Sequence, residues 1–192
     1  MSDDVRRFLF FAGSLRRASL NKRLARHASE LAVGHGMDAR FLDLADYPMP
    51  IYDGDYEAEH SLPENARALK RLFAEADGFF LASPEYNGSF SPLLKNTLDW
   101  MSRRGDDPAD APSPFRGKVA GIAAASSGRL GGLRGLVPLR QLLTNLGVTV
   151  VPRQHALGGA PEKLPADGAP ADEATREAIG AVLAAMSATR VG

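Results

Sequence analysis

A polar segment over residues 13–21 follows a hydrophobic run of strand length and precedes a segment with helical periodicity. Backbone N–H groups at the start of a helix lack intrahelical acceptors and carry partial positive charge, so such a junction can bind anions. The segment contains a glycine that permits a close turn, short polar side chains and a guanidinium. The residues concerned are Gly13, Ser14, Leu15, Arg16, Ser19 and Asn21. The segment could hold a phosphate group, or it could be a helix capped by Ser19 with solvated arginines. It contains neither a Walker A pattern nor the Gly-x-Gly-x-x-Gly fingerprint.

A second polar segment, over residues 83–89, follows another hydrophobic run. Pro84 fixes one backbone angle and Gly88 permits conformations closed to other residues, so the loop is stiff. A stiff loop can present backbone N–H and C=O groups to the polar edge of a flat heteroaromatic ring. Tyr86 could stack on such a ring or border it, and Asn87 could hydrogen-bond its edge. The alternative is a rigid turn whose Tyr86 packs against the following helix.

Hydrophobic periodicity predicts alternating strands and helices. Apolar runs predict strands at 5–12, 39–44, 78–83, 118–125 and around 148–151. Apolar residues at helical spacing predict helices from 20 until the glycines at 34–36, from the segment 61–64 to about 76, and at 91–103, 136–146 and 172–188. Residues 61–64 form a capping box that would begin the second helix. Segments rich in Pro, Gly or polar residues predict loops at 47–60, 105–117 and 158–170.

Five strands alternating with five helices predict a doubly wound α/β fold. The simplest arrangement is a flavodoxin-like, five-stranded parallel sheet of order 2-1-3-4-5 with helices on both faces, in a single domain over residues 1–192. In this order the ligand crevice lies between strands one and three, and these strands lead into the two polar segments. A phosphate site and a ring site at one crevice point to flavin mononucleotide (FMN) as the cofactor and to a flavin oxidoreductase.

Composition disfavours several other classes of function. The 23 basic and 23 acidic side chains give a net charge of +0, which provides no general attraction to nucleic acid or to an anionic membrane. With 0 cysteines, disulfides, thiolate metal sites and thiol nucleophiles are excluded. The 4 histidines are scattered without ligand spacing, so we expect no metal site. The run at residues 8–12 is far too short for a membrane span or a signal core, and we predict a cytoplasmic protein.

Four stretches of the chain resemble the NADPH-dependent FMN reductase family, which includes quinone, chromate and azo-dye reductases. The stretches occur in the family's order and spacing, at 13–21, 84–89, 94–103 and 125–132. The resemblance implies that the FMN phosphate is held by Ser14, Arg16, Ser19 and Asn21. It implies that the ring and ribityl chain are bordered by the loop of Pro84, Glu85, Tyr86, Asn87 and Gly88. A third loop, at the polar edge of the ring, is matched by Ser126, Ser127 and Gly128.

The resemblance also implies a mechanism and an assembly. Hydride passes from NADPH or NADH through bound FMN to an acceptor such as a quinone, free flavin, azo dye or metal oxyanion, and no catalytic side chain is required. Family members form dimers or tetramers with flavin sites near subunit contacts, so Arg103 is a candidate interface residue or nicotinamide-phosphate ligand. Two alternatives stay open: a non-catalytic flavodoxin-type electron carrier, and a flavin-binding regulatory protein.

Two features depart from the family pattern. The segment 104–116 is longer and more acidic than the typical connector. Pro138 falls inside the expected fourth helix, where it either marks the first turn or kinks the helix. In the third expected helix, we predict that Asp99 caps or pairs locally, that Trp100 anchors the helix to the sheet, and that Lys95 lies on the surface or at an interface.

Overall fold

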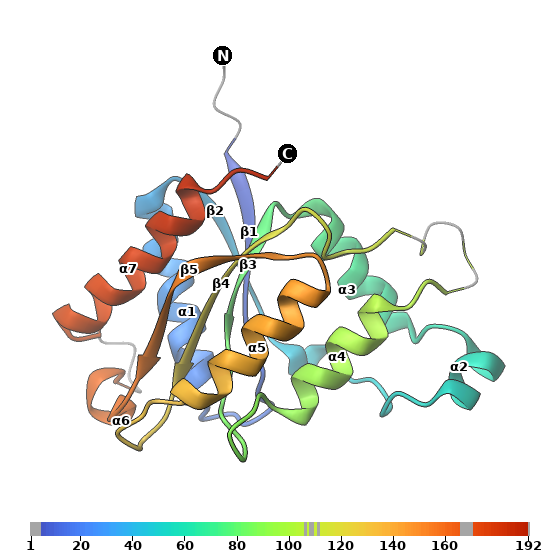
Figure 1. The fold of residues 1–192 in the computed structure, drawn as a ribbon, viewed down its shortest axis with the longest axis horizontal. Coiled ribbons are helices and arrows are strands. Elements are labelled where there is room, and N and C mark those ends of the chain that lie inside the picture. The colour runs from blue at the N-terminus through green and yellow to red at the C-terminus, as the bar shows by residue number, and fades with distance from the viewer. Residues whose placement is uncertain (1–4, 106, 108–109, 111, 166–170, 192) are drawn as a thin grey trace.

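A five-stranded parallel sheet of order β2-β1-β3-β4-β5 lies at the centre of the computed structural model, which describes residues 5–105, 107, 110, 112–165 and 171–191. The strands are β1 (Arg6–Ala12), β2 (Met37–Leu42), β3 (Gly78–Ala82), β4 (Val119–Ala125) and β5 (Thr149–Leu157). Each neighbouring pair is parallel, and the register of β4 against β5 shifts between Ala120 and Ile122. The predicted strand order is confirmed (Figure 1).

The side chains of β1 enter two separate cores because successive residues of a strand point to opposite faces of the sheet. Phe8 and Phe10 belong to one cluster of buried side chains, whereas Leu9 and Phe11 belong to the other. Phe10 packs against Phe80 of β3, with ring centroids 5.7 Å apart. The nearly continuous apolar run in the sequence is therefore explained by burial on both faces.

Helices cover both faces of the sheet (Figure 1). The cluster around Phe10 includes buried side chains of α1 (Leu20–Ala32) and α7 (Glu173–Ala188). The cluster around Phe11 includes those of α3 (Glu64–Glu75), α4 (Pro92–Ser102) and α5 (Leu133–Asn145). The described residues also form two short α-helices and two 3-10 turns, α2 (Gly54–His60), α6 (Ala160–Lys163), η1 (Val33–His35) and η2 (Leu44–Asp46).

The helices that follow β1 and β3 begin with serine caps. Ser19 Oγ accepts the N–H of Lys22 at 3.3 Å, and Ser91 Oγ accepts the N–H of Leu94 at 3.2 Å. Each cap satisfies one of the N–H groups that a helix start leaves without an intrahelical acceptor. Both helices therefore begin at positions fixed by local sequence, directly after the two polar segments.

The prediction of a loop over 47–60 is wrong for its second half, which forms α2. Asp53 caps this helix by accepting two of its first N–H groups. Ser61, predicted to cap α3, instead ends α2 with a φ of 60°, and Pro63 occupies the N-cap position of α3. The capping-box pattern was ambiguous because one helix ends only a few residues before the next begins.

Other boundaries also differ from the sequence predictions, among them the start of β2 at Met37 and the end of β5 at Leu157. The second strand ends at Leu42, because Asp43 caps η2 by accepting the Ala45 N–H at 3.0 Å. Helix α5 begins at Leu133, so Pro138 lies in its interior and not in its first turn. The segment predicted as a loop over 158–170 contains α6, and its residues 166–170 lie outside the described ranges.

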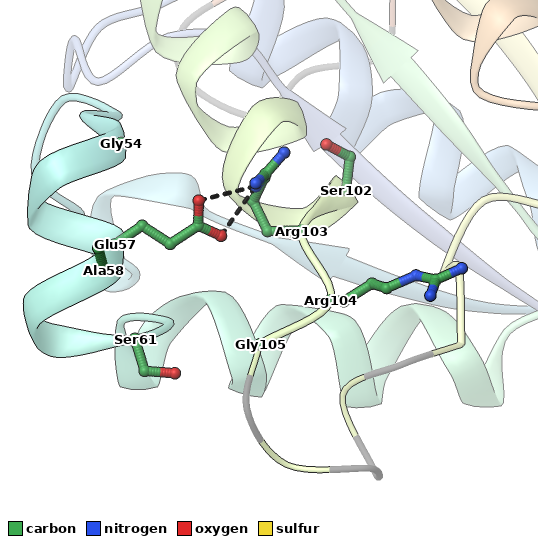
Figure 2. A pocket seen from close by; sticks show the side chains of 8 residues that line it. All are labelled: Gly54, Glu57, Ala58, Ser61, Ser102, Arg103, Arg104 and Gly105. Atoms are coloured by element: carbon green, nitrogen blue, oxygen red, sulfur yellow. Dashed lines mark hydrogen bonds and ion pairs between the residues drawn. The ribbon is translucent and has the colours of Figure 1, made fainter.

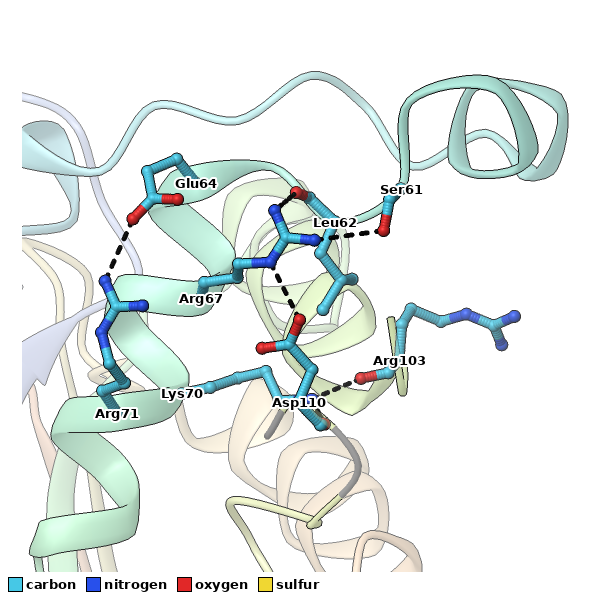
Figure 3. A network of polar contacts seen from close by, with 8 residues as sticks. All are labelled: Ser61, Leu62, Glu64, Arg67, Lys70, Arg71, Arg103 and Asp110. Atoms are coloured by element: carbon cyan, nitrogen blue, oxygen red, sulfur yellow. Dashed lines mark hydrogen bonds and ion pairs between the residues drawn. The ribbon is translucent and has the colours of Figure 1, made fainter. Parts of the chain in front are cut away.

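The connector between α4 and β4, predicted to be an exposed loop, is attached to α3 by buried groups. Asp110 and Phe115 are 8% and 0% exposed. Arg67 Nε donates to the Asp110 carboxylate at 2.9 Å. Lys70 Nζ donates to the backbone carbonyls of Arg103 and Asp110 (Figure 3). These contacts join side chains of one helix to backbone far along the chain, so hydrophobic periodicity could not predict them.

Trp100 was predicted to anchor α4 to the sheet, but it packs elsewhere. Its ring lies in a small buried cluster with Leu62 and Ala66, and its Nε1 donates to the carbonyl of Pro50 at 2.8 Å. Trp100 therefore joins α4 to α3 and to the segment before α2.

The polar residues of α4 agree with their predictions. Lys95 Nζ lies 2.6 Å from an Asp99 carboxylate oxygen, which confirms that Asp99 pairs locally. The Lys95 side chain is 49% exposed, as expected for a surface residue.

Candidate functional site

A pocket of about 420 Å³ lies where the loops after β1, β3 and β4 converge. Parallel strands bring their carboxyl ends to one edge of the sheet, so segments distant in sequence meet there. Most residues predicted to bind the cofactor line this pocket: Ser14, Arg16, Ser19, Asn21, Pro84, Glu85, Tyr86, Ser126 and Ser127. The remaining predicted residues belong to the same loops but do not line it: Gly13, Leu15, Asn87, Gly88 and Gly128.

The start of α1 presents backbone donors to this pocket. The Ser19 N–H bonds the carbonyl of Arg16 at 3.2 Å, and the Arg16 N–H bonds Ser14 Oγ at 3.3 Å. Within the described residues, no hydrogen bond is made by the N–H groups of Ala18, Leu20 and Asn21. Open N–H groups at a helix start are the donors that a phosphate monoester accepts from. The donor set therefore fits the phosphate of FMN.

Two arginines line the same end of the pocket. The Arg16 side chain is exposed, and its guanidinium makes no hydrogen bond or ion pair with any residue that the structure describes. Arg23, one turn into α1, donates through Nη1 to the carbonyl of Leu164 at 3.3 Å. The sequence prediction missed Arg23 as a pocket residue, although its position four residues after Ser19 on the same helix face was an available signal.

Asn21 joins the first loop to the end of β4. Its side-chain nitrogen donates to the carbonyl of Ala125 and its oxygen accepts the Ala125 N–H, both at 2.9 Å. Only 3% of Asn21 is exposed. This two-point contact fixes the position of the first loop relative to the third.

Gly13 packs closely against the start of α4. Its N–H donates to the carbonyl of Ala82 at 3.0 Å, and its own carbonyl accepts from Ser91 Oγ at 2.7 Å. A Cβ at position 13 would lie 3.0 Å from Ser91 Oγ and 3.2 Å from Leu94 Cβ. The glycine is therefore needed for the close approach of the first loop to α4.

The loop after β3 forms a tight hairpin. Tyr86 and Ser89 exchange two backbone hydrogen bonds, of 2.8 and 3.0 Å. Between them Asn87 and Gly88 have φ values of 52° and 79°, the pattern of an Asn-Gly type I′ turn. Tyr86 is 47% exposed and lines the pocket, and it belongs to none of the three hydrophobic clusters found in the described residues. The geometry therefore favours a tyrosine that faces the pocket over one packed against the next helix.

Glu85 connects this hairpin to the start of α5. Its Oε2 accepts the N–H groups of Arg134 and Gly135 at 3.0 and 3.3 Å, and its Oε1 accepts from Arg134 Nε at 2.7 Å. Gly132 at the N-cap of α5 supplies no side-chain cap, so the acidic group of a distant loop takes that role. This explains why the sequence did not predict where α5 begins.

The loop after β4 completes the pocket. The Ser126 N–H donates to the carbonyl of Leu157 at 3.1 Å, and its Oγ donates to the carbonyl of Gly128 at 3.3 Å. Ser127 is exposed and lines the pocket, as does Pro161 of α6. The helix α6, which was not predicted, thus contributes to the site.

Comparison with known proteins identifies the family. Residues 6–162 match the family model described as NADPH-dependent FMN reductase. The chain belongs to this family. It is 34% identical over 181 residues to an NAD(P)H:quinone oxidoreductase of Solanum tuberosum, an alignment that covers 92% of this chain and 88% of the relative. It is 35% identical over 187 residues to an NAD(P)H-dependent FMN reductase of Pseudomonas aeruginosa, with 97% and 95% covered.

A solved structure resembles this FMN reductase family member closely. The flavoenzyme NAD(P)H:(acceptor) oxidoreductase of Paracoccus denitrificans superposes with a TM-score of 0.79 at 27% identity, covering 95% of this chain and 96% of the other. The flavodoxin-like fold predicted from the sequence is confirmed. The predicted function is also confirmed: the chain is an FMN-dependent NAD(P)H oxidoreductase with a small-molecule acceptor.

In this FMN reductase, Arg103 lies apart from the pocket. It ends α4, whereas Ser91 at the start of the same helix contacts the first loop. Arg103 Nε donates to both carboxylate oxygens of Glu57 at 2.8 and 2.9 Å, and this hydrogen bonding raises the Arg103 pKa. Arg103 lines a separate pocket of about 540 Å³. Figure 2 shows this pocket between α2 and the end of α4. Its predicted contact with a nicotinamide phosphate or with another subunit stays a prediction.

Two half-buried histidines of the family member each have a ring nitrogen without a polar partner in the described chain. Among the described residues, His27 Nε2 and His155 Nε2 are buried and have no hydrogen-bond partner. Burial lowers the pKa of both imidazoles. No group of three or more potential metal ligands occurs in the described part of the chain. None of the helices in the described ranges has the length and hydrophobicity of a transmembrane segment.

Proposed function

We propose that the pocket beyond β1, β3 and β4 holds FMN, and that the chain uses NADPH or NADH to reduce quinones. Residues 1–192 act in this proposal as one FMN-binding domain. The observation that carries it is the convergence of open N–H groups at the start of α1 with a rigid hairpin that turns Tyr86 toward the same pocket.

The phosphate end of the cofactor belongs at the start of α1. The N–H groups of Ala18, Leu20 and Asn21 have no other acceptor in the described structure, and the Arg16 guanidinium is free to pair with the phosphate. Ser14 and Ser19 add hydroxyl groups that line the pocket. Asn21 takes part chiefly by holding the first loop against β4.

The ring end belongs between the hairpin and the third loop. Pro84, Glu85 and Tyr86 border it on one side, with Asn87 and Gly88 forming the turn that keeps them in place. The side chain of Glu85 is occupied by α5, so its backbone is what it offers to the ring. Ser126, Ser127 and Gly128 border the polar edge of the ring.

FMN bound there would supply the hydride chemistry that links the nicotinamide to the acceptor. The protein's part is placement: rigid loops hold the phosphate and the ring edge, and an open face admits two substrates in turn. No side chain of the pocket is assigned as a nucleophile or as an acid–base pair. Quinones are the proposed acceptor class because several relatives are named as quinone reductases.

The test is the visible spectrum of the purified protein before and after anaerobic addition of NADPH, followed by a benzoquinone. We expect flavin absorbance, bleaching by NADPH, recovery with the quinone, and steady NADPH oxidation when both are present. A protein that is colourless and takes up no FMN at micromolar concentration would overturn the cofactor site. Flavin that turns over only with an added redox protein would indicate a carrier. Flavin that neither nicotinamide reduces would indicate a regulatory role.

We also propose that the protein is a homodimer or homotetramer in the cytoplasm, with Arg103 at a subunit contact. The Arg103 side chain is 47% exposed and borders a pocket, which leaves it accessible to a second copy. Sedimentation should give two or four times the chain mass of 20.5 kDa, and Arg103→Ala should lower it. A wild-type monomer would contradict the assembly, and activity confined to another cell fraction would contradict the location.

A further inference from the structure

A second pocket, of about 340 Å³, adjoins the proposed FMN pocket. Glu85 and Ser126 line both, so the two hollows share a border formed by the hairpin and the third loop. The second pocket also contains two cationic side chains, Arg129 from the third loop and Arg134 from the start of α5.

The two arginines differ in whether their guanidinium groups are paired. The Arg134 guanidinium is paired with Glu85, with Nε and Nη2 each 2.7 Å from Oε1, so its charge is balanced within the chain. Arg129 is exposed, and its guanidinium has no hydrogen bond or ion pair to any described residue. The pocket therefore carries one uncompensated positive charge, on Arg129.

The backbone that carries Arg129 is tightly packed. A Cβ at Gly158 would lie 2.3 Å from the Arg129 carbonyl oxygen, and a Cβ at Gly131 would lie 2.5 Å from the carbonyl carbon of Leu157. The Gly131 N–H also bonds the carbonyl of Gly128 at 3.2 Å. A free charge on a fixed backbone loses little chain entropy when it binds a ligand, which favours a recognition role.

We propose that this second pocket binds a phosphate group of the nicotinamide dinucleotide and that Arg129 is its recognition cation. The inference rests on the proposed FMN site, because a dinucleotide whose nicotinamide reaches the flavin must extend its phosphates to a neighbouring surface. Quinones carry no such charge, so an anion site beside the flavin serves the hydride donor. Arg129 suits the role because a guanidinium offers several N–H donors to phosphate oxygens. Leu130, 56% exposed in the same pocket, offers apolar surface to the adenine.

The phosphate can be either the pyrophosphate, which NADPH and NADH share, or the 2′-phosphate, which only NADPH carries. Steady-state kinetics of Arg129→Ala with each nucleotide and a fixed quinone separates the two. We expect the KM for NADPH to rise about tenfold, the typical effect of losing one hydrogen bond to a charged group, with kcat and bound FMN unchanged. A rise for NADPH alone assigns the 2′-phosphate, and an equal rise for both nucleotides assigns the pyrophosphate.

The matched control is Arg104→Ala, which removes another exposed guanidinium without a partner in the described structure, at the separate pocket near Arg103. It should leave both KM values unchanged. Unchanged KM values in Arg129→Ala, or an equal rise in Arg104→Ala, would overturn the assignment. All KM values are measured on enzyme loaded with FMN. If the proposed FMN site is wrong, the wild-type protein will contain no flavin, and this is detected before the kinetic measurements.

Discussion

The two pockets at opposite ends of α4 differ more in their polar groups than in their size. The larger, about 540 Å³, lies beside Arg103, whose guanidinium is bound by both oxygens of Glu57 (Figure 2). Next to it, Lys70 donates to two backbone carbonyls and Arg67 donates to the Asp110 carboxylate (Figure 3). The smaller, about 420 Å³, has open N–H groups at the start of α1.

The polar groups near Arg103 are hydrogen-bonded within the chain and stabilise the fold. The N–H groups of Ala18, Leu20 and Asn21 at the start of α1 have no acceptor in the described chain and can bind a ligand. A buried polar group costs free energy unless it is hydrogen-bonded, so folding saturates it wherever a partner is in reach. The open N–H groups at the start of α1 have no acceptor in the described chain. A cofactor can accept hydrogen bonds from them. Volume alone would select the pocket near Arg103, whose guanidinium is already paired with Glu57.

The largest expected effect is on stability, from Lys70→Ala. The substitution leaves the carbonyls of Arg103 and Asp110 without a buried donor, which should lower the free energy of unfolding by roughly 2–4 kcal/mol. Chemical denaturation measures this, and FMN titration should show unchanged affinity. Lys95→Ala, which removes only a surface pair, should cost about 0.3–0.5 kcal/mol. An FMN affinity that falls along with stability would remove the distinction between the two regions.

The next effect is on cofactor affinity, from Arg16→Ala. Losing a charged donor to the phosphate should weaken FMN binding by about 10- to 100-fold, because such hydrogen bonds contribute about 1.5–3 kcal/mol. Stability of the FMN-free protein should change little, because the side chain is exposed. Arg17→Ala is the control, since Arg17 is exposed but does not line the pocket. Wild-type flavin content in purified Arg16→Ala would argue against the phosphate assignment.

A smaller effect is expected at the contact between the hairpin and α5. Glu85→Gln removes the charge that caps α5 and should lower the free energy of unfolding by about 1 kcal/mol. Arg134→Ala keeps the backbone caps and loses only a partly exposed pair, so it should cost less. Thermal melts of both variants compare the two. Equal losses would mean that the ion pair, and not the cap, fixes the start of α5.

The smallest effect is the pH dependence that a half-buried imidazole gives to stability. Burial and then Lys163 lower the pKa of His155 below its usual 6.5, with Asp172 opposing them. The unfolded chain therefore binds a proton below about pH 6.5 that the folded protein does not. The free energy of unfolding consequently decreases as the pH is lowered below about 6.5, by at most about 1.4 kcal/mol per pH unit. His155→Leu should reduce this slope between pH 6.5 and 5, measured by denaturation. A slope untouched by His155→Leu would contradict the mechanism.

Much of the fold was predictable because its determinants are local. Alternating burial of Phe8 to Phe11 specifies a strand covered on both faces, and Ser19 and Ser91 mark helix starts through their own side chains. The start of α5 was missed because its cap comes from Glu85, far along the chain. The helix α2 was missed because none of its residues is buried. Its sequence therefore has no periodic hydrophobic pattern that would indicate a helix.

By itself, the sequence determined the strand order, the two loops that meet at the switch point and the class of cofactor, since strand burial, turn residues and short donors depend on near neighbours. Only the tertiary structure decided which groups stay free. In the folded protein Asn21 is hydrogen-bonded to Ala125, Glu85 to the start of α5, and Lys70 to the connector between α4 and β4. Arg16 and Arg129 have no partner in the described chain. Whether a polar group is available depends on acceptors that reach it from distant segments, and periodicity along one chain carries no information about them.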